Sequence, residues 1–435
     1  MLPIVFKVLQ ILKKISGNDL VKVFSFTGLS TFVKLVTGYV SIKVVASVIG
    51  PAGIALLGQL QNFVSIFTTL GAGGINNGVV KYVAEYRESE TTLQKFISTG
   101  LRITVFFSLL FGMVMMLFSK TLSRWILLDE KYYYVFLFFG ITLLLLSLNN
   151  FLLSVINGFK EFKKYVVVNI VTSLLGLLFT VFLVLMCQLE GALIAVVTYQ
   201  SVVFFATILM IRKSPWFSWA NFRGTIDKAV ARKYLSYSLM ALVTAATVPV
   251  SQLLIRKYLI NNLSLDAAGY WEAMNRVSSL YMMFVTTTLS IYYLPKLSET
   301  KDSKLRNEVS AAYKIIIPFV VISLTGMFFL KDMVVQILFT PEFSPMKELF
   351  FWQLLGDFFK VTSWILAFIM VAKAMTKVFV FTEIFFGILL VMLTYFFINI
   401  SGFQGVAQAY CINYFLYLLF MILIFRKLLF KKSTV

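Results

Sequence analysis

Charged side chains inside long apolar stretches are the residues of this sequence best placed to do chemistry. Lys34, Arg276 and Lys360 each lie within a stretch that is apolar enough to cross a lipid bilayer. Placing such a charge near the bilayer centre costs at least about 2.5–3.5 kcal/mol, so these groups usually face a cavity or one another. The three cations therefore indicate a cavity that attracts anions.

Two carboxyl groups accompany these cations at helical spacing. Glu272 precedes Arg276 by four residues and Asp357 precedes Lys360 by three, which places each pair on one helix face. Under one interpretation, each pair neutralises itself and holds helices together. Under the other, the cations line a cavity of positive balance, and Asp357 and Glu272 tune them and carry protons for ion coupling.

Uncharged polar residues extend this candidate lumen. Gln59 and Asn62 lie in a separate apolar stretch, whereas Asn275 and Gln353 lie in the stretches of Arg276 and Lys360. A glycine-rich segment, GAGGINNG, occupies 71–78. The segment lacks the Gly-Lys-Ser/Thr ending of a phosphate loop and follows an apolar helix rather than a strand, so we expect no nucleotide site. It forms either a close helix contact or a bend, and a bend would leave three further residues facing the cavity: Asn76, Asn77 and Lys81.

The residue types that are missing exclude several kinds of active site. The sequence has no His and two Cys, Cys187 and Cys411. A His-based zinc site, a Ser-His-Asp triad and a disulfide framework are therefore excluded. We expect no cofactor and no metal centre, and we expect a transporter rather than an enzyme.

The elements that position these residues are membrane-spanning helices. Of the 435 residues, 60% are hydrophobic and 13% are charged, whereas a soluble domain has about a quarter charged. A spanning helix needs about 20 mostly apolar residues. Twelve stretches qualify: 24–48, 53–80, 98–118, 132–157, 165–187, 191–211, 234–258, 267–294, 312–331, 347–372, 377–398 and 404–425. The sequence thus predicts an all-α integral membrane protein with twelve transmembrane helices.

The basic residues are distributed unevenly between the loops. The tails and alternate loops carry 28 Lys and Arg, whereas the other six loops carry 7. This bias predicts that both termini are cytoplasmic. It also explains most of the net charge of +20, so nucleic-acid binding is not needed to account for it. The basic, amphipathic N-terminus has no small-residue cleavage site and is predicted to lie at the membrane surface.

A weak internal repeat divides the chain. The longest polar break, 212–233, separates two sets of six predicted helices, and similar segments recur about 214 residues apart, such as NGFKEFKKYVVVN near 157 and VAKAMTKVFVFTE near 371. Parallel repeats of this kind occur in transporters with a midplane site. We therefore expect an N-terminal six-helix lobe at 1–218 and a C-terminal lobe at 219–435.

Three segments resemble Wzx-type flippases of O-antigen and enterobacterial common antigen, members of the multidrug/oligosaccharidyl-lipid/polysaccharide exporter superfamily. They are VIGPAGIALLGQLQNFVSIFTTLGAGGINNGVVKYVAEY at 48–86, SIYYLPKLSE at 290–299 and FWQLLGDFFKVTSWILAFIMVAKA at 351–374. The resemblance implies a V-shaped, two-lobed transporter in the bacterial inner membrane. Its substrate would be an undecaprenyl-diphosphate-linked oligosaccharide, moved to the periplasmic leaflet by alternating access. It also implies charged lumen residues at Lys34, Lys81, Asp357, Lys360 and Lys373.

Three other classes of function stay open at this point. A multidrug exporter of the same superfamily would favour a lumen of negative charge. A membrane polymerase or glycosyltransferase of the same pathway would need a larger catalytic loop than the predicted external loops, of which the longest has about 16 residues. A purely structural membrane scaffold leaves Lys34 and Asp357 unexplained. The polymerase and the chain-length regulator of the pathway are expected as partners beside membrane lipid.

Overall fold

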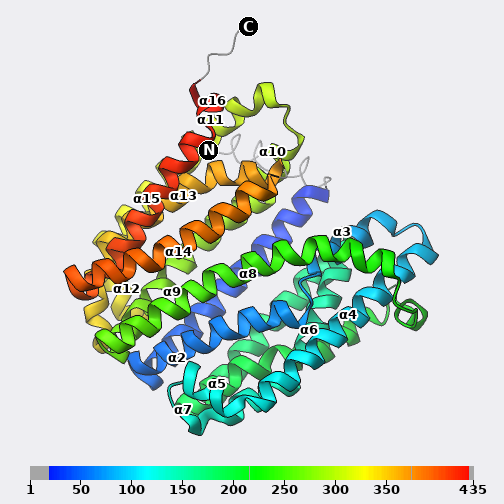
Figure 1. Cartoon of the computed structure of the whole chain (residues 1–435), viewed down its shortest axis with the longest axis horizontal. Helices are drawn as coiled ribbons and strands as arrows, with labels where there is room; N and C mark the ends of the chain where they lie inside the picture. Colours follow the sequence, from blue (N-terminus) through cyan, green and yellow to red (C-terminus); the bar gives the residue numbers. More distant parts are fainter. Residues whose placement is uncertain (1–18, 215, 374, 431–435) are drawn as a thin grey trace, which may run out of the picture. The chain divides into compact units, whose positions relative to one another are not determined.

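The part of the chain that the structure describes is mainly helical. The computed structural model covers residues 19–214, 216–373 and 375–430, and these ranges contain helices and no β-strand (Figure 1). Seven helices in these ranges are long and apolar enough to cross a membrane. The prediction of an all-α, multi-pass membrane protein is therefore confirmed. The amphipathic N-terminus lies largely outside the described residues.

Two compact units make up the described chain, and the first comprises its residues within 19–44 and 67–242. It contains the first part of α2 (Asp19–Gly71), α3 (Asn76–Tyr86), α4 (Glu90–Leu117), α5 (Ser119–Ile126), η1 (Glu130–Tyr132), α6 (Tyr133–Gly158), α7 (Phe162–Ile211), η2 (Trp219–Phe222) and the start of α8 (Lys228–Asn262). Helix α6 packs against α3, α4 and α7 (Figure 1). A Cβ atom on Gly112 would lie 2.6 Å from the carbonyl oxygen of Gly140, so these glycines allow α4 and α6 to approach closely.

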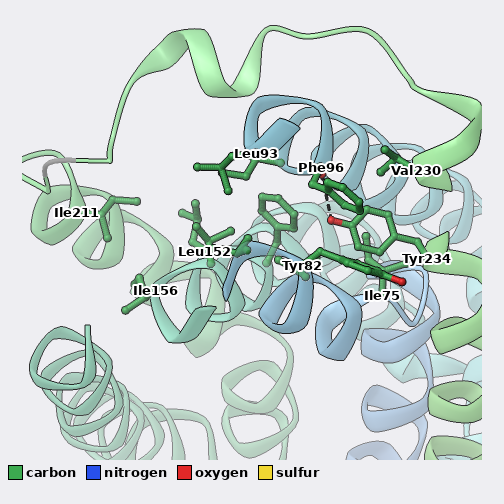
Figure 2. Close-up of a cluster of buried hydrophobic side chains, with 14 residues drawn as sticks. Ile75, Tyr82, Leu93, Phe96, Leu152, Ile156, Ile211, Val230 and Tyr234 are labelled. Carbon is green, nitrogen blue, oxygen red and sulfur yellow. Dashed lines mark hydrogen bonds between the residues drawn. The ribbon is translucent and has the colours of Figure 1, made fainter. Parts of the chain in front are cut away.

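An aromatic core joins α3, α4 and α8 inside this unit. The rings of Tyr82 and Phe96 stack at 4.6 Å, and Tyr234 meets both rings edge-on. The Tyr234 hydroxyl donates a hydrogen bond of 3.1 Å to the carbonyl of Phe96 (Figure 2). This bond satisfies the polar end of a ring that is otherwise surrounded by hydrophobic side chains.

The second unit comprises the described residues within 45–66 and 243–430. Besides parts of α2 and α8 it contains α9 (Leu265–Thr288), η3 (Leu289–Tyr293), α10 (Leu294–Glu299), α11 (Asp302–Phe329), α12 (Lys331–Leu338), η4 (Pro341–Leu349), α13 (Phe350–Ala372), α14 (Thr376–Ser401), η5 (Gly402–Gln404), α15 (Gly405–Ile424) and α16 (Arg426–Phe430). Helix α13 packs against α11 and α15, and α14 packs against α15.

Sharp breaks interrupt the longest helices. Helix α7 is non-helical at Cys187 and Gln188, and a Cβ atom on Gly191 would lie 1.9 Å from the carbonyl oxygen of Leu183. In a straight helix, residues eight apart are about 12 Å apart along the axis. The chain therefore reverses here, and Gly191 is needed because a side chain would not fit.

The same close approach of a glycine to a backbone carbonyl recurs 214 residues later, where a Cβ atom on Gly405 would lie 2.2 Å from the carbonyl oxygen of Phe397. Element lengths repeat as well. Helices α4 and α11 each have 28 residues, and each is followed by a helix of eight, α5 or α12. These repetitions favour the predicted internal repeat. The lobes at 1–218 and 219–435 stay a prediction.

The glycine-rich segment forms a bend, which is one of the two interpretations that the sequence left open, and this bend interrupts the predicted span 53–80. Helix α2 ends at Gly71, and α3 begins at Asn76. Between them Gly73 and Gly74 both have a φ of 66°, a conformation that side-chain-bearing residues rarely adopt.

Candidate functional site

A buried cluster of charges lies in the second unit, between α2, α8 and α9. The Arg256 side chain is fully buried, and its Nη2 atom lies 2.5 Å from Glu272 Oε2. Its Nη1 atom donates to Gln59 Oε1 at 2.9 Å, and its guanidinium lies 5.4 Å from the centre of the Trp271 ring. The fit is tight, because a Cβ atom on Gly58 would lie 2.6 Å from Glu272 Cδ.

Glu272 serves a second arginine at the same time. Arg276 Nε lies 3.1 Å from Glu272 Oε1, which confirms the contact predicted from their spacing of four. Arg276 Nη2 also donates to Gln61 Oε1 at 2.8 Å. One carboxylate is thus shared by two guanidinium groups, so the cluster keeps a net positive charge. The Arg276 side chain is 14% exposed and is therefore the arginine that a ligand can reach.

A cavity of about 500 Å³ lies in the same unit. Regular spacing on each helix produces its wall, because residues three and four apart share a face. Helix α13 contributes Gln353, Asp357, Lys360 and Trp364 at spacings of four, three and four. Other lining residues come from α8, α9, α14 and α15, and they include Ser251, Trp271, Asn275, Ser278, Thr382, Glu383, Tyr410, Asn413, Tyr414 and Tyr417.

Asp357 is fully buried and is held by hydroxyl groups. Tyr410 donates to its Oδ1 atom at 2.6 Å, and Ser278 donates to its Oδ2 atom at 2.6 Å. Tyr281 donates a further short hydrogen bond to Oδ2. Three donors from α9 and α15 thus compensate a carboxyl group that burial would otherwise destabilise.

Aromatic rings surround Lys360, and it forms no ion pair with Asp357. No carboxylate lies within 4.0 Å of its Nζ atom among the described residues, so Asp357 and Lys360 share a helix face without forming a direct ion pair. Instead, Nζ lies 5.0 Å from the ring centres of Trp364 and Tyr414 and donates to the Tyr410 hydroxyl at 3.2 Å. The Tyr410 hydroxyl therefore links the two charged groups.

Carboxyl groups are in excess on the wall of this cavity. Its charged lining residues are Asp357, Lys360 and Glu383, so carboxyl groups outnumber the cation. The excess of cations occurs at the Arg256–Glu272–Arg276 cluster. The structure thus separates a positively charged cluster from a cavity that is polar, aromatic and slightly acidic.

The remaining predicted site residues are dispersed. In the first unit, Lys34, Asn77 and Lys81 are exposed, Asn76 is half-buried, and Lys81 Nζ lies 5.1 Å from the centre of the Tyr82 ring. In the second unit, Lys373 donates to the Thr300 carbonyl at 2.8 Å. Neither Lys373 nor Asn62 is among the residues that line the cavity.

Sequence reasoning missed Arg256, Glu383 and the tyrosines. Arg256 falls at the end of the predicted span 234–258, where a charged residue is expected to belong to the adjoining outer loop. Helix α8 in fact continues to Asn262. The tyrosines gave a usable signal, since Tyr410, Tyr414 and Tyr417 recur at the helical spacing of one face.

Comparison with known proteins agrees with the resemblance seen in the sequence. Two similar proteins, each named lipid III flippase, come from Escherichia coli (strain K12) and Shigella flexneri. Each is 29% identical over 400 residues, which cover 92% of this chain and 96% of the relative.

Solved structures share the fold at low sequence identity. An inward-facing multidrug resistance MATE family transporter of the MOP superfamily has a TM-score of 0.72 at 11% identity, over 92% of this chain and 96% of its own. The inward closed conformation of the lipid II flippase MurJ has a TM-score of 0.68 at 13% identity, over 93% and 87%. The model of the family described as polysaccharide biosynthesis protein matches residues 20–301, more than half of the chain. The chain therefore belongs to the polysaccharide biosynthesis protein family.

Proposed function

We propose that this protein is a flippase for an undecaprenyl-diphosphate-linked oligosaccharide, an O-antigen or enterobacterial common antigen repeat unit, rather than an enzyme. The observation that carries the proposal is the membrane-embedded cluster in which two arginines share one carboxylate. The lipid III flippase relatives support the same class of substrate. A net positive charge inside a membrane protein lowers the cost of bringing a diphosphate into the hydrocarbon layer.

The same proposal includes the number of spans, the lobes and the topology. The chain would form twelve spans in two six-helix lobes around a central cavity. It would lie in the bacterial inner membrane with both termini cytoplasmic. The breaks at Gly50 and Cys187–Gln188 support this number of spans, because each divides one long helix into two spans of membrane length. The polymerase and the chain-length regulator of the pathway are proposed partners.

Arg276 is the proposed contact for the diphosphate. Its guanidinium is held by Glu272 and Gln61 and is partly accessible, so it is already oriented before an anion binds. A guanidinium presents several parallel N–H donors to a phosphate group, which an ammonium group does not. Lys34 and Lys81 of the first unit, and Lys360 and Lys373 of the second, are proposed to contribute further positive charge.

Asp357 is the proposed group for ion coupling, with Glu272 as the second candidate. The three hydroxyl donors around Asp357 come from α9 and α15, so a rearrangement of these helices would change how well its ionised form is stabilised. Asp357→Asn is expected to keep substrate binding and to lose the dependence of flipping on a proton gradient.

Flipping of a fluorescent lipid-linked oligosaccharide in proteoliposomes tests both the role of Arg276 in anion binding and the role of Asp357 in ion coupling. Arg276→Ala should reduce flipping strongly, and Arg276→Lys should restore little if bidentate contact matters. The exposed Lys304→Ala is the matched control. A normal flipping rate in Arg276→Ala would overturn the anion site. A normal gradient response in Asp357→Asn would make Asp357 a structural residue.

A multidrug exporter is the second candidate, and one observation favours it. The cavity of the second unit is aromatic and slightly acidic, which suits an organic cation. Export of tetraphenylphosphonium by proteoliposomes, in the absence of flipping, would establish this function instead.

A further inference from the structure

The cavity of the second unit contains buried polar atoms that no protein group satisfies. Gln353 Oε1, Asn413 Oδ1 and Asn275 Nδ2 are buried and have no hydrogen-bond partner among the described residues. Gln353 and Asn413 are 1% and 3% exposed, and all three residues line the cavity. Leaving such atoms unpaired is costly, so their presence points to a ligand that pairs with them.

The pattern of these atoms specifies the ligand chemistry. Two of the free atoms are acceptors and one is a donor, so a ligand must offer hydroxyl groups that both donate and accept. Glu383 adds carboxyl oxygens to the same wall. Lys360 adds a donor beside it. A polyhydroxylated ring meets these needs, whereas an apolar cation would leave every one of these amide atoms unpaired.

Aromatic rings supply the remaining part of the wall. Trp271, Trp364 and Tyr414 line the same cavity. A sugar ring has C–H groups on its faces and hydroxyl groups around its edge, so it packs on an aromatic face while its edge forms hydrogen bonds. The volume of about 500 Å³ lies within the range of small-ligand sites, roughly 300–1,000 Å³.

The charges of the wall indicate a neutral sugar. Asp357 already accepts hydrogen bonds from three hydroxyl groups, and neither it nor Glu383 offers a positive charge to a sugar carboxylate. Lys360 is the only cation that lines the cavity among the described residues, and the Tyr410 hydroxyl already accepts a hydrogen bond from it.

We propose that this cavity is the glycan-binding subsite of the protein and that it takes one or more neutral sugar rings. In this proposal Gln353 and Asn413 accept hydrogen bonds from sugar hydroxyls, Asn275 donates to a ring or hydroxyl oxygen, and Trp364 packs on a sugar face. The identity of the biological ligand, the glycan of a lipid-linked oligosaccharide, rests on the proposed function. The glycan is thereby assigned to the cavity and the diphosphate to the Arg256–Glu272–Arg276 cluster, two separate sites within one unit.

Saturation-transfer difference NMR on the full chain in nanodiscs tests this subsite, because the method detects weak binding of free sugars next to protein protons. The probes are methyl β-glucoside, N-acetylglucosamine and glucuronate, with tetraphenylphosphonium as a competitor. We expect signals from the two neutral sugars and a weaker signal from glucuronate. We expect no displacement of the neutral sugars by tetraphenylphosphonium.

Two substitutions separate ligand binding from structure. Gln353→Leu and Asn413→Leu each remove an unsatisfied buried acceptor, and Gln353→Leu also removes the long hydrogen bond of 3.3 Å from Gln353 Nε2 to Ser278 Oγ. The thermal stability should therefore change little in either variant, whereas sugar binding should weaken at least about tenfold. Trp352→Phe is the matched control, because Trp352 lies on the same helix as Trp364 but does not line the cavity, and binding should not change.

The outcomes distinguish this proposal from the proposed function. Absence of a sugar signal in the wild-type protein, unchanged binding in both Leu variants, or displacement by tetraphenylphosphonium would overturn the subsite. If sugars bind as described but the wild-type protein flips no lipid-linked oligosaccharide in proteoliposomes, the subsite stands and the flippase function fails. If flipping is normal but no sugar binds, the subsite alone fails.

Discussion

Removing the carboxylate shared by the two arginines should destabilise the second unit strongly. Glu272 is the single carboxylate within 4.0 Å of Arg256 or Arg276 in the described chain, and its side chain is 9% exposed. Glu272→Gln would leave two guanidinium groups close together without a compensating charge. Breaking a buried pair by removing one partner costs about 3–5 kcal/mol.

The size of the effect can be expressed as a change in melting temperature. For a folding unit of this size, a loss of that magnitude corresponds to a fall of roughly 10 °C. Thermal unfolding in nanodiscs, followed by intrinsic fluorescence, measures it. Asp332→Asn is the control, because Asp332 pairs with Lys347 at an exposed position, where the hydrogen bond from Lys347 lowers the pKa of the Asp332 carboxyl group. We expect no measurable change in that variant.

A second substitution tests whether charge balance is the cause. Arg256→Met removes a buried cation and leaves Glu272 paired with Arg276, so the cluster becomes neutral. It should destabilise the protein much less than Glu272→Gln. If Arg256→Met were as damaging as Glu272→Gln, or if Glu272→Gln unfolded at the wild-type temperature, the reasoning from charge balance would be refuted.

Two further predictions follow from the fold. Gly405→Ala should lower the yield of folded protein, since its Cβ atom would lie 2.2 Å from a backbone oxygen. Gly326→Ala in α11 should fold normally, because nothing lies within 4 Å of the added atom. Size-exclusion chromatography after extraction compares the two variants. The topology can be tested by cysteine labelling in a protein whose two native cysteines are replaced by serine. In intact cells, Arg223→Cys should resist a membrane-impermeant maleimide, whereas Leu263→Cys should react with it. Efficient labelling of residue 223 would contradict the proposed cytoplasmic location of this loop.

Helix content and local charge pairs could be predicted from the sequence because both depend on neighbours along the chain. The apolar stretches were long enough to span a bilayer, and the described chain is helical there. The contact of Glu272 with Arg276 was also predictable, because a helix brings residues four apart together whatever packs around them. The turn at 71–75 was left open between two interpretations, since glycine permits a bend without requiring it.

Tertiary packing decided which partners the charges have. Arg256 reaches Gln59, which is 197 residues away along the chain, and Asp357 accepts from Tyr410, 53 residues away, rather than from Lys360 at a spacing of three. Helical periodicity determines which face a side chain occupies, but it does not determine which helix covers that face. In a membrane interior a buried charge takes the best donors and acceptors that any packed helix offers, so only the folded structure determines its partners.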